Sequence, residues 1–239
     1  MKYIFTEIGL HKINIIILSL VFILLCIQLY ATTSKGFEGF ENTRRYTFIH
    51  VPKTSGSALH KVLDKYPKNF DVYSNHFHNM VATKFNRPIL CIREPTDRFL
   101  SIYKYWRQHA PKFYPKINTS LKYFIQLLKK KSKFLLVGNP PFLSEYHYFQ
   151  QVNYIDPSVY PYSIIIMYDK NQMEAKTNAL LKYLEITEKD VPVPVKNVSL
   201  KTDVQLDDED LQYVQEKYKD DYQLWDELQQ HPEKFLKIF

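Results

Sequence analysis

The sequence predicts an α/β fold, in which a P-loop-like parallel sheet is flanked by helices, in a domain that spans residues 46–239. Stretches of strand pattern alternate along this domain with stretches of helix pattern, and such alternation favours a parallel sheet covered on both faces. A separate, long apolar stretch near the N-terminus predicts one transmembrane helix before the domain.

The alternation assigns the individual elements. We expect strands over residues 46–51, 88–92 and 162–167, and helices over residues 57–65, 95–106 and 173–184. Asp207 is a plausible N-cap of a last helix, with Asp210 three residues on. Apolar side chains follow at helical spacing, and we expect them to be core packing: Leu211, Val214, Tyr218, Tyr222 and Trp225.

Composition excludes several classes of protein. Of the 239 residues, 45% are apolar and 24% charged, which excludes collagen-like, disordered and low-complexity chains. The two cysteines, Cys26 and Cys91, are too few for a disulfide framework or a Cys-based zinc site. The net charge of +7 favours anionic partners such as nucleotides, glycans, nucleic acid or anionic lipid, without choosing among them. We find no usual DNA- or RNA-reading motif and expect no nucleic-acid partner.

The N-terminal stretch carries no formal charge from Ile13 to Ser34. In a helix it would be about 33 Å long, enough for a hydrocarbon core of about 30 Å. We therefore predict a transmembrane anchor over residues 13–31, after a tail of residues 1–12 and before a stem of residues 32–45. A cleaved signal peptide is the alternative, but its apolar region is usually shorter. Basic residues flank both sides, so the charges do not set the orientation.

The first expected strand leads into HVPKTSGSA, residues 50–58, which we call the lysine loop. A strand, a turn with Gly56 and a helix start together aim backbone N–H groups at one point, which suits a phosphate or sulfate. Lys53 adds a cation, and hydroxyl donors come from Thr54, Ser55 and Ser57. The lysine precedes the glycine, so this is not a Walker A loop, and a P-loop kinase is disfavoured. A plain strand-to-helix connection is the alternative.

The second expected strand leads into REPTDRFLSIYKYW, residues 93–106, which we call the arginine motif. Pro95 suits the first turn of a helix, on which Arg98, Ser101 and Tyr105 share one face. Arg93 lies at the carboxyl end of its strand, where open α/β sheets bind ligands. Two such motifs on successive strands predict a ligand with two separated anionic groups.

These motifs resemble those of membrane-bound Golgi carbohydrate sulfotransferases, most closely the group that includes heparan sulfate uronosyl 2-O-sulfotransferase. The resemblance covers residues 46 to about 228 and is concentrated in the lysine loop, the arginine motif with the strand before it, and the C-terminal helix pattern. It implies the sulfotransferase fold and the donor 3′-phosphoadenosine 5′-phosphosulfate. The family usually has Gly-Gly or Gly-Ser after Lys-Thr, whereas here Ser55 precedes Gly56.

The resemblance also implies which residues bind the donor. The 3′-phosphate would lie against Arg93 and Ser101, and Lys201 would belong to a basic segment that folds over the nucleotide. The 5′-phosphosulfate would be held by Lys53, Thr54, Ser55, Gly56, Ser57 and Ala58.

Sulfuryl transfer needs a base for the acceptor hydroxyl and a cation for the leaving oxygen. Lys53 is placed by its loop to be the cation. His76 is the first candidate for the base and His78 the second, because the pair resembles the His-x-His element of the 2-O-sulfotransferase group. Ordinary surface or packing histidines are the alternative. No third ligand is spaced to complete a metal site, and we expect no metal.

The remaining positions give smaller predictions. His147 and Gln151 resemble a His-x-x-x-Gln element that lies beside donor and acceptor, with core packing as the alternative. Glu94 and Arg98 are spaced for a structural ion pair. Asn118 and Asn197 match the glycosylation pattern. A further cluster could hold an anionic glycan, although a solvated helix face is the simpler interpretation: Lys129, Lys130, Lys131 and Lys133.

Taken together, the resemblance implies a single-pass type II enzyme of the Golgi membrane with its catalytic domain in the lumen. It would transfer a sulfuryl group to a hydroxyl of an anionic glycan. Alternatives within the same machinery are protein-tyrosine or lipid sulfation. A non-catalytic nucleotide-binding membrane protein and an ATP-dependent kinase are further alternatives.

Overall fold

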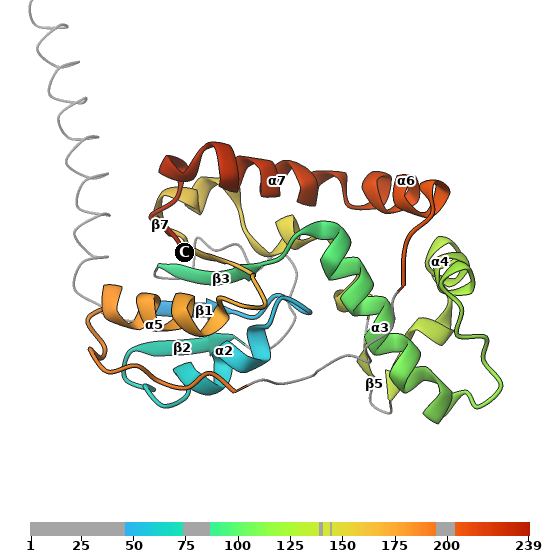
Figure 1. The fold of residues 1–239 in the computed structure, drawn as a ribbon, viewed down its shortest axis with the longest axis horizontal. Helices are drawn as coiled ribbons and strands as arrows, with labels where there is room; N and C mark the ends of the chain where they lie inside the picture. Colours follow the sequence, from blue (N-terminus) through green and yellow to red (C-terminus); the bar gives the residue numbers. More distant parts are fainter. Residues whose placement is uncertain (1–45, 74–86, 139–140, 144, 195–203) are drawn as a thin grey trace, which may run out of the picture. The chain divides into compact units, whose positions relative to one another are not determined.

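The fold centres on a parallel sheet, shown in Figure 1, in a computed structural model that describes residues 46–73, 87–138, 141–143, 145–194 and 204–239. The strand order is β2-β1-β3-β6-β7, and each neighbouring pair is parallel. The bounds are Tyr46–Ile49 for β1, Phe70–Tyr73 for β2, Pro88–Ile92 for β3, Ile164–Met167 for β6 and Lys237–Ile238 for β7. The predicted parallel sheet is confirmed.

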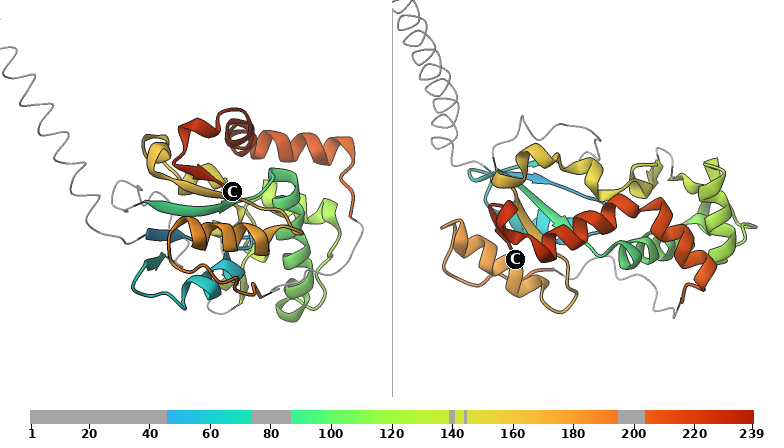
Figure 2. Two further views of the ribbon diagram at one scale, coloured as in Figure 1. Left: turned by 60° about the vertical axis from the view of Figure 1, so that its left-hand side comes forward. Right: turned by 90° about the horizontal axis from the view of Figure 1, so that it is seen from above.

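Alternate side chains of the central strand β3 pack on opposite faces of the sheet, as the pleat requires. Ile89 and Cys91 belong to the core under α2 (Gly56–Leu63) and α5 (Met173–Tyr183). Leu90 and Ile92 belong to the core under α7 (Lys219–Gln230). Figures 1 and 2 show α2 and α5 on one side of the sheet and α7 on the other. The expected cover on both faces is therefore confirmed.

Several predicted boundaries move in the structure. The first predicted helix begins at Gly56 rather than Ser57 and ends at Leu63. The third strand begins at Ile164 rather than Tyr162, because the preceding Pro157–Tyr162 segment forms a 3-10 helix. Two short strands, β2 and β7, were not predicted.

Helix α3 (Pro95–Phe113) is longer than its motif and continues through Pro111 to Phe113. Beyond the sheet it packs with α4 (Leu121–Lys129) around Trp106 and Phe124, whose ring centroids lie 5.0 Å apart. A two-stranded antiparallel pair, β4 (Val137–Gly138) and β5 (Pro141–Leu143), borders this cluster. Short 3-10 helices cover Lys133–Leu135, Glu145–Tyr148, Gln151–Tyr154 and Pro232–Lys234.

The last predicted helix is two helices, and its prediction as one element was wrong. Asp207 caps α6 (Asp208–Lys217) by accepting from the N–H of Asp210, as expected. The helix stops at the buried Tyr218, whose hydroxyl donates to the Tyr148 carbonyl at 3.1 Å, and α7 begins at the next residue. The break lets α6 pack beside α3 while α7 covers the sheet.

The anchor, tail and stem predicted for residues 1–45 lie outside the described residues. Within the described part of the chain, no helix has the length and apolar character needed to cross a membrane.

The helix start at Gly56 gives a test of the lysine loop's packing. A Cβ at this position would lie 2.1 Å from Cδ2 of the His50 ring. Gly56→Ala must therefore displace that ring, and we expect it to lower the free energy of unfolding by about 1–3 kcal/mol. Urea denaturation measures the change, with Ser57→Ala on the same turn as the control. A Gly56→Ala protein as stable as the control would contradict this packing.

Candidate anion-binding site

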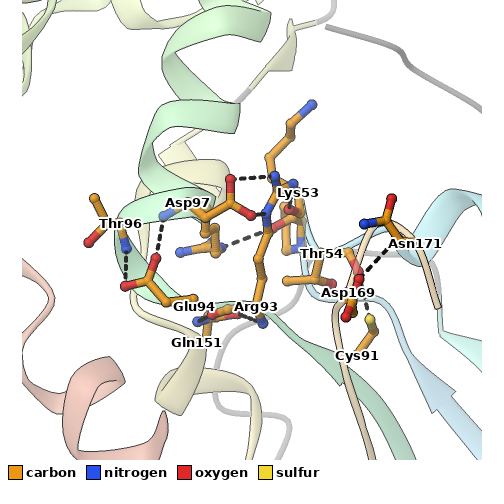
Figure 3. A network of polar contacts seen from close by, with 12 residues as sticks. Lys53, Thr54, Cys91, Arg93, Glu94, Thr96, Asp97, Gln151, Asp169 and Asn171 are labelled. Carbon is orange, nitrogen blue, oxygen red and sulfur yellow. Dashed lines mark hydrogen bonds and ion pairs between the residues drawn. The ribbon is translucent and has the colours of Figure 1, made fainter. Parts of the chain in front are cut away.

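The lysine loop and the arginine motif leave adjacent strands at the same edge of the sheet. Phe48 of β1 pairs with Ile89 of β3, so the two strands end side by side. The carboxyl ends of parallel strands carry the ligand sites of open α/β sheets. The geometry therefore brings the two predicted motifs to one place, which Figure 3 shows at close range.

The backbone of the lysine loop is unusual. Lys53 and Ser55 lie in the left-handed region, with φ values of 66° and 73°. The Ser55 carbonyl accepts from the N–H of Ala58, but its side chain does not cap α2. The N-terminal N–H groups of α2 thus lack a side-chain cap, and the positive end of the helix dipole faces the loop. Ser55 also occupies the position where the resembling family usually has glycine, a residue that adopts this conformation without steric cost.

Thr54 and Cys91 join the lysine loop to the central strand. Thr54 is buried, and its hydroxyl donates to the Val51 carbonyl at 2.9 Å. Its own carbonyl accepts from the Cys91 thiol at 2.6 Å. Burial raises the pKa of Cys91 to about 12, so the thiol stays protonated and keeps this bond. The Thr54 hydroxyl therefore donates within the turn, whereas the sequence analysis expected it to donate to a ligand.

Arg93 is held on three sides. Its Nε and one terminal nitrogen donate to the Asp97 carboxylate at 2.7 and 2.8 Å, and the other terminal nitrogen donates to the Lys53 carbonyl at 3.2 Å. The guanidinium lies 4.2 Å from the centre of the Tyr168 ring. These bonds use three of its five N–H donors within the described residues. Arg93 is thereby fixed against the lysine loop with donors left for a ligand.

Gln151 fixes the main chain at the same point. Its side-chain oxygen accepts from the Arg93 N–H at 2.9 Å, and its side-chain nitrogen donates to the Arg93 carbonyl at 2.7 Å. Gln151 is fully buried, and His147 is buried as well. The carbonyl of His147 accepts from Arg98 at 3.3 Å. The predicted pair therefore borders the arginine residues, and its contact with an acceptor stays a prediction.

Lys53 lies in an unusually positive environment. Burial, together with the charges of Arg93 and Arg98, lowers its pKa to about 8. Its ammonium group stands 4.0 Å from the centre of the Tyr105 ring, which belongs to α3. Ser101, on the same helix, is buried. Three cations within mutual influence favour the binding of an anion.

Arg98 shows a correction to the sequence analysis, because it does not pair with Glu94. Glu94 instead caps α3 by accepting from the N–H groups of Thr96 and Asp97 at 3.0 and 2.6 Å. Arg98 is only 1% exposed and forms an ion pair with the buried Asp221 at 3.8 Å. It also donates to three carbonyl oxygens, those of Pro52, His147 and Phe149, at 3.0, 3.3 and 2.8 Å.

Asp221 was missed by the sequence analysis although a signal was present. It follows Tyr218 by three residues and precedes Trp225 by four, so it lies on the apolar stripe that predicted the last helix. A carboxylate on a buried stripe requires a partner. The stripe therefore also supplies the counter-charge of Arg98, in addition to the packing expected of its apolar side chains.

A family comparison decides what kind of protein carries this site. A model of the sulfotransferase family matches residues 32–226. The chain belongs to the sulfotransferase family. Neither a curated protein nor a solved structure gave a match. The chain is therefore a sulfuryl-transferring enzyme that takes an acceptor substrate. The sulfotransferase family, which the two motifs indicated, is confirmed.

Some predicted residues of this sulfotransferase fall outside the described part of the chain: His76, His78, Lys201 and Asn197. Among the described residues, no group of three or more His, Cys, Asp or Glu side chains could hold a metal ion. Asn118 is exposed, and its side chain accepts from the Ser120 N–H at 2.9 Å. The clustered lysines near the end of α4 are exposed too: Lys129, Lys130, Lys131 and Lys133.

The buried Arg98–Asp221 pair gives a stability prediction for the sulfotransferase domain. Arg98→Met removes the partner of a fully buried carboxylate, and three carbonyls lose a donor. We expect the free energy of unfolding to fall by about 3–5 kcal/mol. Chemical denaturation measures it, with the exposed Lys112→Met on the same helix as the control. Equal stability of the two variants would show that the pair does not support the fold.

Proposed function

We propose that this sulfotransferase transfers a sulfuryl group from 3′-phosphoadenosine 5′-phosphosulfate to a hydroxyl of a glycan. The observation that carries the proposal is the contact between the two motifs, in which Arg93 donates to the Lys53 carbonyl. Two cations of separate loops therefore meet at neighbouring strand ends. Such an arrangement suits one ligand with an anionic group at each end.

Three features of the described residues support a doubly anionic donor. The start of α2 lacks a side-chain cap, Arg93 has donors left, and Lys53 has a pKa lowered partly by neighbouring positive charges. Arg93 and Ser101 would take the 3′-phosphate, and Lys201 would approach the nucleotide from its own segment. The 5′ end would take Lys53, Thr54, Ser55, Gly56, Ser57 and Ala58.

The reaction would be an in-line displacement at sulfur. The acceptor oxygen forms a bond to sulfur while the bridging oxygen leaves with the nucleotide phosphate and carries away the bonding electron pair. The Lys53 ammonium group would stabilise the negative charge on that leaving oxygen. His76 or His78 would accept the proton of the acceptor hydroxyl, because a neutral imidazole is a good base near neutral pH.

The glycan acceptor and the Golgi location rest on the resemblance of the two motifs and on charge. The chain is positive overall, and exposed lysines near α4 would attract an anionic chain. The apolar residues 13–31 would anchor the enzyme in the Golgi membrane as a type II protein, with the domain in the lumen. Tyrosine or lipid sulfation would use the same donor site with another acceptor.

Incorporation of labelled sulfate tests the function. The full-length protein in detergent is incubated with the labelled donor and with desulfated glycosaminoglycans, a tyrosine peptide or a glycolipid. We expect labelling of a glycosaminoglycan, a loss of at least 100-fold in Lys53→Ala, and no change in Lys189→Ala, which removes an exposed lysine outside both motifs and the α4 cluster. Label confined to the peptide or lipid would refute the glycan acceptor, and calorimetry showing Mg²⁺-dependent ATP binding in place of donor binding would indicate a kinase.

The lowered pKa of Lys53 predicts an alkaline limit to activity. The ammonium form is needed, and it is lost as the pH rises through about 8. We expect kcat/KM, which reports the free enzyme, to fall about tenfold per pH unit above that value. In Lys53→Arg the charge persists, so the decline should move to higher pH. An unchanged alkaline limb in Lys53→Arg would show that another group causes it.

The assignment of the base has its own test. We expect the double variant His76→Ala, His78→Ala to lose turnover by about 10²–10⁴-fold, because it lacks a proton acceptor. Its affinity for the product nucleotide should remain that of the wild type, which calorimetry measures. His231→Ala, an exposed histidine in the described part of the chain, is the control. Wild-type turnover in the double variant would refute both candidates.

A further inference from the structure

Asp221 is a buried carboxylate that the proposed reaction does not use. It lies near the start of α7 and is 0% exposed. Its Oδ2 is 3.8 Å from the Arg98 guanidinium and has no hydrogen-bond partner among the described residues. Burying a carboxylate with one oxygen left without a hydrogen bond costs free energy. Its place in the core therefore indicates a role in the structure or the function.

Through Arg98, Asp221 acts on the lysine loop. The Nε of Arg98 donates to the Pro52 carbonyl at 3.0 Å, in the residue directly before Lys53. Lys53 itself stands in the left-handed region. A non-glycine residue keeps that conformation only when its surroundings hold it there. The buried guanidinium is one such restraint, and Asp221 is the carboxylate that balances its charge.

Through the segment at Gln151, Asp221 also acts on the arginine motif. Its Oδ1 accepts from the Val152 N–H at 3.0 Å, which fixes the start of the 3-10 helix Gln151–Tyr154. The preceding Gln151 is the residue whose amide holds both backbone groups of Arg93. Next along α7, the Tyr222 hydroxyl bonds to the Thr96 hydroxyl at 2.7 Å.

We propose that Asp221 is a positioning residue that holds Lys53 and Arg93 together in the arrangement that binds the donor. It acts indirectly. Arg98 connects it to the lysine loop, and the segment at Gln151 connects it to Arg93. The inference rests on the proposed function, because it assigns both cations to one donor. It adds that a single carboxylate from the C-terminal helix controls both motifs.

The charge of Asp221 is sensitive to pH. Burial raises its pKa to about 6, while Arg98 and hydrogen bonds from Val152 and Gln151 oppose that rise. Among the described residues, Tyr218 and Tyr222 are the other ionisable side chains whose charge would act on Asp221, and both are neutral at this pH because tyrosine titrates near pH 10 and burial raises their pKa values further. His147 lies beyond Arg98 and meets it through a carbonyl. Acidification through pH 6 would therefore remove the charge that holds Arg98.

The test compares Asp221→Asn with Asp226→Asn, which removes an exposed carboxylate from the same helix. Calorimetry with the full-length protein measures the affinity for 3′-phosphoadenosine 5′-phosphate. We expect Asp221→Asn to bind about tenfold more weakly than the control at pH 7.5. At pH 5 the two should agree within twofold, because the control then also carries a neutral Asp221. Titration of the ligand phosphates affects both proteins equally and cancels in this ratio.

The outcomes separate the two hypotheses. If the Asp226→Asn protein does not bind the nucleotide at either pH, the proposed donor site fails. If it binds and Asp221→Asn binds equally well at pH 7.5, Asp221 has no positioning role and the donor site stands. A deficit that stays as large at pH 5 would also overturn the inference, because a purely structural defect does not depend on the charge of Asp221.

Should Asp221→Asn fail to fold, hydrogen exchange of the wild type provides the test. After correction for intrinsic rates, we expect the amides of residues 53–57 to lose protection at least fivefold between pH 7.5 and pH 5. The amides of α5, on the face of the sheet opposite α7, should keep theirs. Equal protection of residues 53–57 at both pH values would overturn the inference.

Discussion

The Arg93 guanidinium is held against the main chain of Lys53, near enough for the two positive side chains to repel each other, and the site depends on this constraint. Burial is the main cause that lowers the pKa of Lys53, and the charges of Arg93 and Arg98 add to it. The fold offsets part of this cost with two carboxylates, Asp97 on Arg93 and Asp221 on Arg98. The repulsion that remains is released when an anion binds, so the same cost that opposes folding favours a ligand of opposite charge.

The backbone of the lysine loop shows the same exchange of stability for function. Left-handed conformations at Lys53 and Ser55 and an uncapped start of α2 are each unfavourable in isolation. They persist because the surroundings over-determine the turn: Thr54 bonds within it, Cys91 bonds to it from β3 and Arg98 bonds to its beginning. Strain retained in this way is typical of sites that contact ligands.

The features of the fold and the site that depend on local sequence patterns could be predicted. The alternation of strands and helices gave the parallel sheet, and the turn chemistry around Gly56 gave the lysine loop. The position of Arg93 at the end of β3 followed from the strand that precedes it. The strand β7 has only two residues, too few for a clear period-2 pattern. The strand β2 is as long as β1 and β6, but the charged Asp71 interrupts its apolar run, so it was not predicted.

Contacts between distant segments could not be predicted from one sequence. The clamp of Gln151 on Arg93 joins residues 58 positions apart, and Asp221 meets Arg98 across a still longer separation. Local spacing suggested Glu94 as the partner of Arg98, but the Glu94 carboxylate instead caps α3 by accepting from backbone N–H groups. Arg93 then pairs with Asp97 one turn later.

The most direct test of the central claim asks whether Lys53 and Arg93 contact opposite ends of one nucleotide. Calorimetry compares binding of 3′-phosphoadenosine 5′-phosphate and adenosine 5′-phosphate to the wild type, Lys53→Ala and Arg93→Ala. The account predicts that Lys53→Ala weakens both ligands, whereas Arg93→Ala weakens only the ligand that carries a 3′-phosphate. Equal effects of Arg93→Ala on both ligands, or no effect of either substitution, would contradict it.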